Sequence, residues 1–475
     1  MLLLLVLTLL PLSARAADWP MWGRTPSRNM TCPETNLPSA FDPGKPKPDS
    51  EEIDPATTKN VKWVAKLGSQ SYGNPTVAAG RVFVGTNNEC PRDPKTKGDY
   101  GILMCLEEAT GKLLWQLAVP KLAAGKDCDY DFVGICSSPT VEGERAYLVT
   151  NRCEVVCLNV RDASVVWRYD MRDELGVFPH QMTASSVLIV GERLYATTSN
   201  GRDWSEKHIP SPNSPALICL DKKTGKLLGQ EDSGISRRMF LCNWSSPAFG
   251  RVADRDMIFF GGGDGFCYAF DPVPVKNAAG VDVLKEIWRF DCNPPQRRMQ
   301  DGKPVRYGNP KGPSEIIATP AFDDNGRVYV AAGQNPEKAD GDGCLSCIDA
   351  ASGKAVWSYE GMGRSISTVS IADGLVFAAE FAGRVRCLDA RTGTEHWTYD
   401  TEANTWASPL VADGKLYIGG EGGTFTILAA SKEMKLVGKV DFLTTPIYSS
   451  AVVANGVLYI ATDKNLYAIQ GGAKP

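Results

Sequence analysis

Polar and apolar residues alternate along most of the chain in short runs that end at glycine-containing turns. The pattern is clearest within 364–400, where alternating runs at 366–371, 375–380, 384–389 and 394–399 are separated by Asp-Gly, Ala-Gly and Thr-Gly turns. A period of two over such runs predicts strands, and turns of this kind predict antiparallel hairpins. We therefore expect one four-stranded antiparallel sheet from this stretch.

The third strand of that sheet recurs along the chain. Complete copies begin at Cys105, Cys157, Cys347 and Cys387, each with a tryptophan ten positions on, whereas the copy at Cys219 carries glycine at the tryptophan position. Counting the degenerate copies, third strands are expected at residues 105, 157, 219, 269, 347, 387, 427 and 468. Four strands per repeat, at intervals near forty residues, predict the blades of a β-propeller.

The last repeat lacks a fourth strand, since the chain ends at Pro475 soon after its third strand. An unassigned strand, 61–67, precedes the first repeat, and pairing it with the last blade would hide two sheet edges. The prediction is an all-β, eight-bladed propeller of four-stranded antiparallel blades over 60–471, closed by this N-terminal strand. Seven blades is the alternative count.

The N-terminal residues predict export. Residues 1–16 combine a short apolar run with Ala14-Arg-Ala16, which is typical of a secretory signal peptide cleaved before Ala17. No other segment is apolar enough to cross a membrane, so no transmembrane anchor is expected. We expect a periplasmic or cell-envelope protein whose residues 17–59 form an irregular leader over the propeller surface.

Charge and cysteine usage narrow the possible functions. A net charge of −4 without a basic stripe argues against nucleic acid as a partner. The cysteines of the repeat are expected to be buried free thiols, and three histidines without paired CxxC motifs make a zinc site improbable by composition. Disulfide candidates are the cysteines expected in loops, with pairing left open: Cys32, Cys90, Cys128, Cys136, Cys153, Cys242, Cys292 and Cys344.

The repeated phrase x-Leu-Asp-x-x-Thr-Gly-Lys-x-x-Trp resembles the pyrroloquinoline quinone (PQQ) type propeller repeat. The resemblance implies that the tryptophan of one blade docks on the next. The family includes quinoprotein alcohol dehydrogenases as well as non-catalytic propellers, such as the BamB-type outer-membrane assembly factor, to which this chain is more similar. Fold alone does not separate these classes.

Resemblance to the dehydrogenases implies possible cofactor-binding residues. Asn200 and Glu154 match positions of calcium ligands, and Trp244 would join them at the cofactor. The sequence departs from the dehydrogenases at two points. It lacks their adjacent cysteine pair, and Asn243 stands where a catalytic aspartate is expected, although an amide cannot act as a base.

Long insertions predict where the protein binds. They fall before or within blades one to five, at 86–100, 118–132, 199–216, 229–243, 272–285, 292–312 and 334–343. Since propellers bind through loops and the central funnel, we expect a binding or scaffolding module that takes a protein, small-molecule or polymer ligand there. It would act as a monomer or within an envelope complex.

Two alternatives remain open. A PQQ- and calcium-dependent alcohol dehydrogenase would bring Asn200, Glu154 and Trp244 together in the funnel. A sugar- or polymer-binding propeller would expose aromatic side chains in the loops, such as Trp204 and Tyr100.

Overall fold

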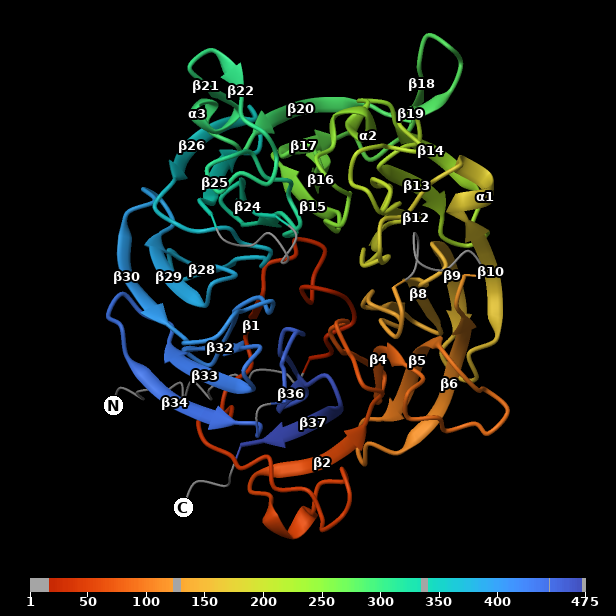
Figure 1. The fold of residues 1–475 in the computed structure, drawn as a ribbon, viewed down its shortest axis with the longest axis vertical. Helices are drawn as coiled ribbons and strands as arrows, with labels where there is room; N and C mark the ends of the chain where they lie inside the picture. The colour runs from red at the N-terminus through yellow and green to blue at the C-terminus, as the bar shows by residue number, and fades with distance from the viewer. Residues whose placement is uncertain (1–16, 123–129, 335–340, 444, 472–475) are drawn as a thin grey trace, which may run out of the picture.

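The strands form eight four-stranded antiparallel blades around a central axis (Figure 1). The computed structural model describes residues 17–122, 130–334, 341–443 and 445–471. The predicted count of eight blades is confirmed, and each predicted third strand is present. The signal-peptide prediction, residues 1–16, lies outside the described residues.

The first four blades run from the innermost to the outermost strand as follows: β3 (Thr76–Ala78), β4 (Arg81–Asn87), β5 (Tyr100–Glu107) and β6 (Leu113–Pro120); β7 (Thr140–Glu142), β8 (Arg145–Val149), β9 (Glu154–Asn159) and β10 (Val165–Asp170); β11 (Leu188–Val190), β12 (Arg193–Thr197), β13 (Leu217–Asp221) and β14 (Leu227–Glu231); β15 (Ala248–Val252), β16 (Arg255–Gly261), β17 (Phe266–Phe270) and β20 (Glu286–Asp291).

Blades five to eight are β23 (Ala321–Phe322), β24 (Arg327–Ala332), β25 (Cys344–Asp349) and β26 (Lys354–Tyr359); β27 (Ser370–Ala372), β28 (Leu375–Ala379), β29 (Arg384–Asp389) and β30 (Glu395–Asp400); β31 (Leu410–Ala412), β32 (Lys415–Gly419), β33 (Thr424–Ala429) and β34 (Leu436–Asp441); β35 (Val452–Ala454), β36 (Val457–Ala461), β37 (Asn465–Gln470) and β2 (Val61–Lys66).

The N-terminal strand closes the ring as predicted. β2 pairs antiparallel with β37, with Trp63 opposite Ala468. The last blade therefore contains both ends of the propeller chain. Because β2 and β37 pair with each other, the facing edges of these two strands are not exposed.

The insertions form small elements on this ring. They include α1 (Met171–Leu175), α2 (Ile235–Arg238), α3 (Pro295–Arg298) and two hairpins, β18 (Val275–Lys276) with β19 (Asp282–Leu284) and β21 (Met299–Gln300) with β22 (Lys303–Pro304). In the described part of the chain, none of the helices has the length and hydropathy needed to span a bilayer.

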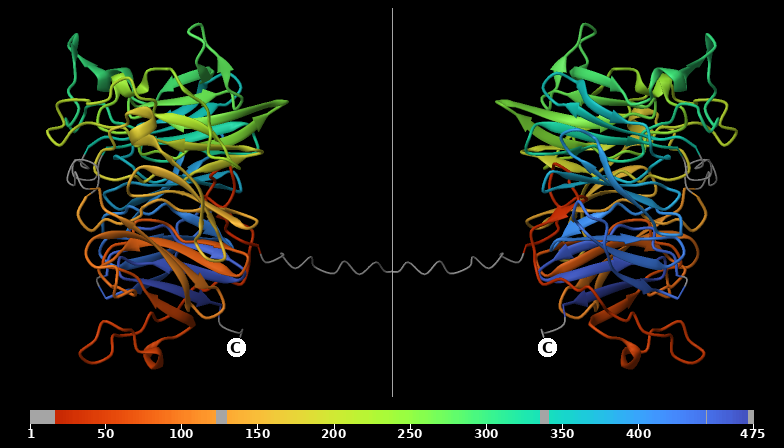
Figure 2. Two further views of the ribbon diagram at one scale, coloured as in Figure 1. Left: turned by 90° about the vertical axis from the view of Figure 1, so that its right-hand side faces the viewer. Right: turned by 90° about the vertical axis from the view of Figure 1, so that its left-hand side faces the viewer.

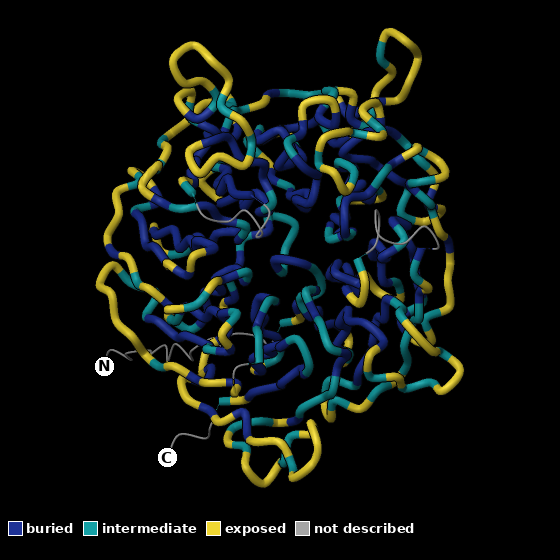
Figure 3. The backbone as a smooth tube through the Cα atoms, viewed as in Figure 1, coloured by how far each residue is buried: buried dark blue, intermediate teal, exposed yellow. Residues whose placement is uncertain are grey.

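The hydrophobic core lies between blades rather than within them. A single blade is one sheet and cannot cover its own faces, so each apolar cluster combines residues of adjacent blades. The inner three strands are mostly buried, while outer strands such as β30 are largely exposed (Figure 3).

A tryptophan on the outer strand fixes six of the eight joints. Its indole N–H donates to a carbonyl oxygen in the turn after the third strand of the next blade, at 2.8–3.0 Å; the pairs are Trp63–Glu108, Trp115–Val160, Trp167–Lys222, Trp288–Ala350, Trp357–Ala390 and Trp397–Ser431. The ring packs on the glycine of the same turn in four of them: a Cβ added at Gly111, Gly225, Gly353 or Gly393 would lie 2.5–2.6 Å from its atoms. The docking implied by the family resemblance is confirmed.

The two joints without tryptophan are covered by other segments. At the tryptophan position of blade three, Gly229 lies against Pro274 of the β18–β19 hairpin, and β19 extends this sheet by pairing parallel with β14. On blade seven, Gly438 lies against Ser39 of the leader, and the Tyr417 hydroxyl donates to the Pro38 carbonyl. The degenerate repeats therefore coincide with added covering elements.

The cysteines separate into confirmed and incorrect predictions. The repeat cysteines are buried free thiols, and burial raises the pKa of the Cys105 thiol to about 12. The disulfide prediction is wrong for five of the loop candidates, which are free thiols: Cys32, Cys90, Cys242, Cys292 and Cys344. Most of these five pack as small apolar side chains. A disulfide stays a prediction for Cys136 and Cys153. Cys128 lies outside the described residues.

The first part of the leader does more than cover the surface. Residues 17–32, which end in β1 (Thr31–Cys32), run across the centre of the ring (Figure 1, red). Their contacts with the innermost strands or the residues flanking them reach all eight blades in turn: Trp19–Val77, Pro20–Val141, Arg28–Val187, Pro26–Phe249, Ser27–Phe322, Asn29–Ile371, Met30–Val411 and Cys32–Val453. The remainder is more exposed on average and includes η1 (Pro55–Thr57).

We call residues 17–32 the plug, and Arg28 anchors the plug near the centre of the ring. The side chain is fully buried, and its guanidinium donates to the carbonyl oxygens of Trp22, Pro247 and Val187 at 2.5–2.9 Å. Burial lowers the pKa of Arg28 to about 9, which still leaves a cation at neutral pH. The positive charge is thus stabilised by carbonyl dipoles from the leader and from two blades.

Substitution of a joint glycine tests the tryptophan contact. Gly393→Ala should lower the free energy of unfolding more than Gly374→Ala in the same blade. Both glycines have φ between +72° and +75°, but only Gly393 meets Trp357, while Gly374 has open space around it. We expect about 1–2 kcal/mol for Gly374→Ala from the left-handed backbone and about 1–3 kcal/mol more for Gly393→Ala. Equal losses in urea unfolding would contradict the contact.

Removing the central guanidinium tests the plug. Arg28→Met should cost about 3 kcal/mol or more, because three buried carbonyl groups lose their donor. Arg24→Met is the matched control: Arg24 is half-buried and its side chain donates to the Thr31 carbonyl, so about 1 kcal/mol or less is expected. Thermal unfolding of the two variants measures the difference, and similar melting temperatures would argue against a central role for Arg28.

Candidate functional site

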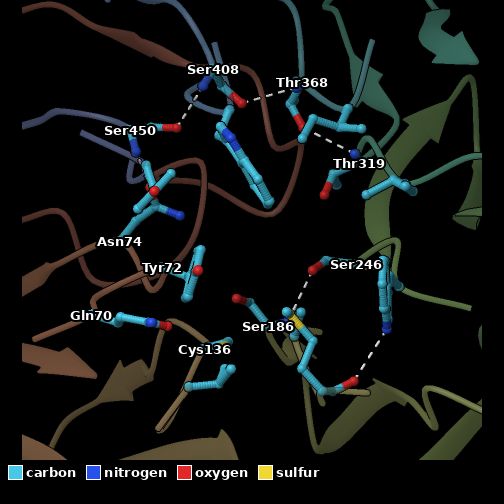
Figure 4. A pocket seen from close by; sticks show the side chains of 18 of the residues that line it. Gln70, Tyr72, Asn74, Cys136, Ser186, Ser246, Thr319, Thr368, Ser408 and Ser450 are labelled. Atoms are coloured by element: carbon cyan, nitrogen blue, oxygen red, sulfur yellow. Dashed lines mark hydrogen bonds between the residues drawn. The ribbon is translucent and has the colours of Figure 1, made fainter. Parts of the chain in front are cut away.

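The central funnel is closed at one end by the leader and holds a cavity. Its volume is about 680 Å³, and Figure 4 shows residues that line it, among them Tyr72, Ser246 and Ser408. Trp22 of the leader also belongs to the lining. Every blade contributes to the lining. Figure 2 gives the side views of the ring, with the N-terminal segment (red) reaching one of its faces. The funnel is therefore a one-ended cavity.

A ring of hydrogen bonds surrounds the base of the cavity. Just before each innermost strand stands one small polar residue: Asn74, Ser138, Ser186, Ser246, Thr319, Thr368, Ser408 and Ser450. At seven of the eight steps the backbone N–H of one of these residues donates to the side-chain oxygen of its counterpart in an adjacent blade. At the remaining step, the Thr319 hydroxyl accepts from the indole N–H of Trp22 at 3.0 Å. We call this set the polar ring.

The plug and the cavity lie on opposite sides of the polar ring along each inner strand. In seven blades the leader contacts the residue three positions after the ring residue, such as Val77 after Asn74. The cavity instead takes the residue two positions before it: Tyr72, Cys136, Ala184, Trp244, Ile317, Ile366, Trp406 and Tyr448. In each blade, one short segment thus contacts the plug on one side of the polar ring and lines the cavity on the other side.

These wall residues are unequal around the funnel. Tyr72, Trp406 and Tyr448, from blades one, seven and eight, pack together with ring centroids 5.0–5.7 Å apart, and Phe381 contacts Trp406 at 5.9 Å. We call Tyr72, Trp406, Tyr448 and Phe381 the aromatic wall. At the other five positions two residues before the polar ring, the side chains are smaller, except for that of Trp244.

The rim adds polar groups and two carboxylates. Glu421 accepts from the Asn404 side-chain amide at 3.1 Å, while Asp131 pairs with Lys121 at 2.9 Å. Gln70 and Gln181 also reach the cavity. No lysine or arginine side chain occurs among the described residues of the lining.

The field around the aromatic wall is negative. Burial, followed by the nearby Glu421 and Asp463 carboxylates, raises the pKa of the Tyr448 hydroxyl. Burial also raises the pKa of Asp463 to about 6, and its Oδ1 has no hydrogen-bond partner in the described structure. Both carboxyl groups therefore act on the Tyr448 hydroxyl.

Of the residues expected at a quinone site, only Trp244 lines the cavity. It is 8% exposed and donates its indole N–H to the Met182 carbonyl at 3.1 Å. Asn200 is fully buried: its amide accepts from the Phe178 N–H and donates to the Ser211 carbonyl. Glu154 lies in a separate groove at 117–120, where it pairs with Arg168 and Arg152. The structure does not bring the three together.

The expected exposed aromatics differ in position. Trp204 is 39% exposed and packs edge-to-face on Tyr130, a residue of the cavity lining, with centroids 4.9 Å apart. Tyr100 is half-buried at the start of β5 and packs against the core instead of the cavity. Trp204 is thus placed at the funnel rim, and Tyr100 is not.

The cavity does not fit PQQ with calcium. The quinone carries three carboxylic acid groups, which call for cationic partners, but the described lining offers two carboxylates and no cation. The described residues also contain no cluster of three or more His, Cys, Asp or Glu side chains arranged for a metal ion. Asn243, at the position of the expected base, is fully buried and uses its amide for the Asn200 carbonyl and the Gly263 N–H.

Sequence reasoning missed most of the funnel. The run 366–371 was expected to be a strand, but β27 begins at Ser370, because the hydroxyls of Ser365 and Ser367 bond carbonyls and Thr368 joins the polar ring. The available signal was a Ser, Thr or Asn, often followed by proline, before each inner strand, as in Asn74-Pro75 and Ser408-Pro409.

Comparison with solved structures gives the same architecture. BamB from Moraxella catarrhalis is 15% identical, covers 86% of this chain and 98% of its own, and has a TM-score of 0.56. A europium-containing methanol dehydrogenase is 11% identical over 97% of this chain and 99% of its own, with a TM-score of 0.62. Quinohemoprotein alcohol dehydrogenase from Comamonas testosteroni is 16% identical over 98% of this chain and 82% of its own, with a TM-score of 0.55. At such identities the likeness shows the fold alone.

Sequence comparison is more specific. No curated protein matches the chain significantly. The family model described as outer membrane protein assembly factor BamB matches residues 57–272 and 281–432, which is most of the propeller. On this match the chain belongs to the BamB family of PQQ-type propellers.

Proposed function

We propose that the protein is an exported binding module that holds its ligand in the one-ended central funnel. This proposal rests on the different roles of neighbouring residues at the start of each inner strand. The polar ring and the plug fix the blades, while the residue two positions before the ring varies from alanine to tryptophan and lines an accessible cavity. A cavity of about 680 Å³ is of the size that small-molecule sites have.

Binding is favoured over oxidation of an alcohol. The residues that would serve calcium, Asn200 and Glu154, are occupied by backbone groups and by arginines, respectively. Asn243 has no acid–base chemistry to offer. The anionic lining further opposes an anionic quinone.

The family supports an envelope role. A BamB-family propeller placed in the periplasm or at the envelope would act alone or within a protein complex, with the decorated loops of blades one to five available to a protein partner. A sugar- or polymer-binding form of the same function is the second candidate, because Trp204 is exposed beside Tyr130 at the rim.

Blocking the funnel tests the proposal. Ala184→Trp should fill the cavity from blade three without touching the polar ring, whereas Ala355→Trp lies on the exposed outer strand β26 as the matched control. In a thermal-shift screen of a small-molecule library, compounds that stabilise the wild type should lose their effect in Ala184→Trp and keep it in Ala355→Trp. A library without any funnel-dependent compound, or compounds indifferent to Ala184→Trp, would contradict the proposal.

The same preparation decides the dehydrogenase alternative. Titration with PQQ and calcium should give no saturable quenching of tryptophan fluorescence. Stoichiometric, calcium-dependent quenching would instead restore the enzyme hypothesis and call for an assay with alcohols and an artificial electron acceptor.

A further inference from the structure

The aromatic wall is a surface of π-faces and edges with a carboxylate at its margin. Tyr72 and Tyr448 are stacked with centroids 5.0 Å apart, and Trp406 meets Tyr448 edge-on at 5.3 Å. Glu421 belongs to the same lining from the turn between β32 and β33 of blade seven. Aromatic faces beside a carboxylate are the combination that attracts an organic cation.

The Glu421 carboxylate at this wall has no protein counter-ion among the described residues, whereas Lys464 and Lys66 lie close enough to Asp463 to favour its charged form. Glu421 is bonded by the neutral Asn404 amide and forms no ion pair in the described structure, unlike Asp131, which Lys121 neutralises. Asp463 adds a second carboxyl group close enough to affect both Tyr72 and Tyr448. A positive ligand would supply the missing charge.

We propose that the funnel binds an organic cation with an ammonium or quaternary ammonium group, seated on Tyr72, Trp406 and Tyr448 with Glu421 as its counter-ion. This rests on the funnel being a binding site at all. A neutral sugar could use the same aromatic faces, but it would gain nothing from the excess negative charge. Charge, rather than shape, therefore separates the two ligand classes.

Choline and its uncharged isostere 3,3-dimethylbutan-1-ol test this distinction, because they differ in charge at nearly constant shape. Calorimetric titration should show choline binding at least about tenfold more tightly than the isostere. Glu421→Gln should weaken choline by about three- to tenfold, through loss of the counter-ion, and leave the isostere unchanged. Glu433→Gln is the matched control and should change neither, because Glu433 is an exposed carboxylate in the turn after β33, at the opposite end of that strand from Glu421.

The outcomes distinguish failure of the organic-cation assignment from failure of the proposed binding function. Equal binding of choline and the isostere, or choline binding insensitive to Glu421→Gln, would overturn the cation assignment. So would funnel-dependent binding of neutral saccharides without choline binding. Absence of any ligand sensitive to Ala184→Trp would instead overturn the binding function itself.

A second, independent observation concerns Glu34 in the leader. Its side chain is 3% exposed, and its oxygens accept from the backbone N–H groups of Ala17, Asn455 and Gly456. No lysine, arginine or histidine among the described residues forms an ion pair with it. A buried carboxylate without a cation is an unusual and costly arrangement.

The contact with Ala17 places this carboxylate at the closing joint of the ring. The Ala17 nitrogen lies 2.9 Å from Glu34 Oε1. Asn455 and Gly456 form the β35–β36 turn of blade eight, and the neighbouring Asp18 accepts from Asn455 and from Ala79 of blade one. The contact thus belongs to the place where the first and last blades meet.

We infer that cleavage of the chain before Ala17 completes this site. Hydrolysis of the Ala16–Ala17 bond, with water as the co-reactant, converts the Ala17 amide N–H into an α-ammonium group at the same position. Glu34 then has its cation, and maturation strengthens the closing joint. An uncleaved or extended chain can offer only a neutral N–H there.

A double-mutant cycle, in which an N-terminal extension is combined with Glu34→Gln, tests the ion pair between the α-ammonium group and Glu34. The chain beginning at Ala17 is compared with one carrying Gly-Ser before Ala17, each with Glu34 or with Glu34→Gln. The extension should lower the melting temperature by about 1–3 °C with Glu34 and by clearly less with Glu34→Gln. An equal loss in both backgrounds would overturn the inference.

Two further measurements keep the test decisive if Glu34→Gln folds poorly. The intact mass of exported protein should correspond to a chain starting at Ala17, and cleavage elsewhere would contradict the inference. In the folded wild type, the α-amine should react with an amine-labelling reagent several-fold more slowly than in the unfolded protein. Equal rates would show that no ion pair protects it.

Discussion

The structure depends on contact between neighbouring blades, because a single four-stranded sheet cannot bury either of its faces. Every apolar cluster spans a joint, and each joint is then fixed by directed bonds: an outer tryptophan reaching the next blade, and the inner polar ring. Where the tryptophan is replaced, at Gly229 and Gly438, an insertion hairpin and the leader cover the gap. Loss of a local contact is thus compensated at the same joint, since an open joint would weaken the closed ring as a whole.

The leader converts a ring with two open ends into a cavity with one. A peptide that contacts all eight blades loses considerable conformational entropy, which must be offset by the buried side chains of Trp19, Trp22 and Arg28 and by backbone hydrogen bonds. Its position also makes the region after Ala17 part of the folding unit. The base of the cavity therefore exists only once the leader is in place.

The fold was predictable from sequence because its signals are local and repeated: period-two alternation, Thr-Gly turns and the tryptophan spacing each report one strand or one joint. The eight third strands and the closing strand at Val61 follow from them. The cavity was not predictable to the same degree, since Tyr72 lies more than 300 residues before Trp406 and Tyr448 and meets them only through closure of the ring. The disulfide prediction failed for a related reason at Cys32, Cys242, Cys292 and Cys344, whose side chains were expected in loops but are buried.

Loop length gave an incomplete guide to the site. The insertions decorate blades one to five, yet three of the four aromatic wall residues come from blades six to eight, where the turns are short. Short turns leave the residues before each inner strand uncovered, so their side chains reach the funnel directly; long loops, such as the one carrying Tyr130 and Trp204, shape the rim instead. Because the wall position lies outside both the polar ring and the strand ladder, its side chain can change without cost to the fold. If the funnel holds the ligand as proposed, the ligand chemistry depends on these wall positions together with Phe381 and Glu421, and not on the repeat signature that fixes the fold.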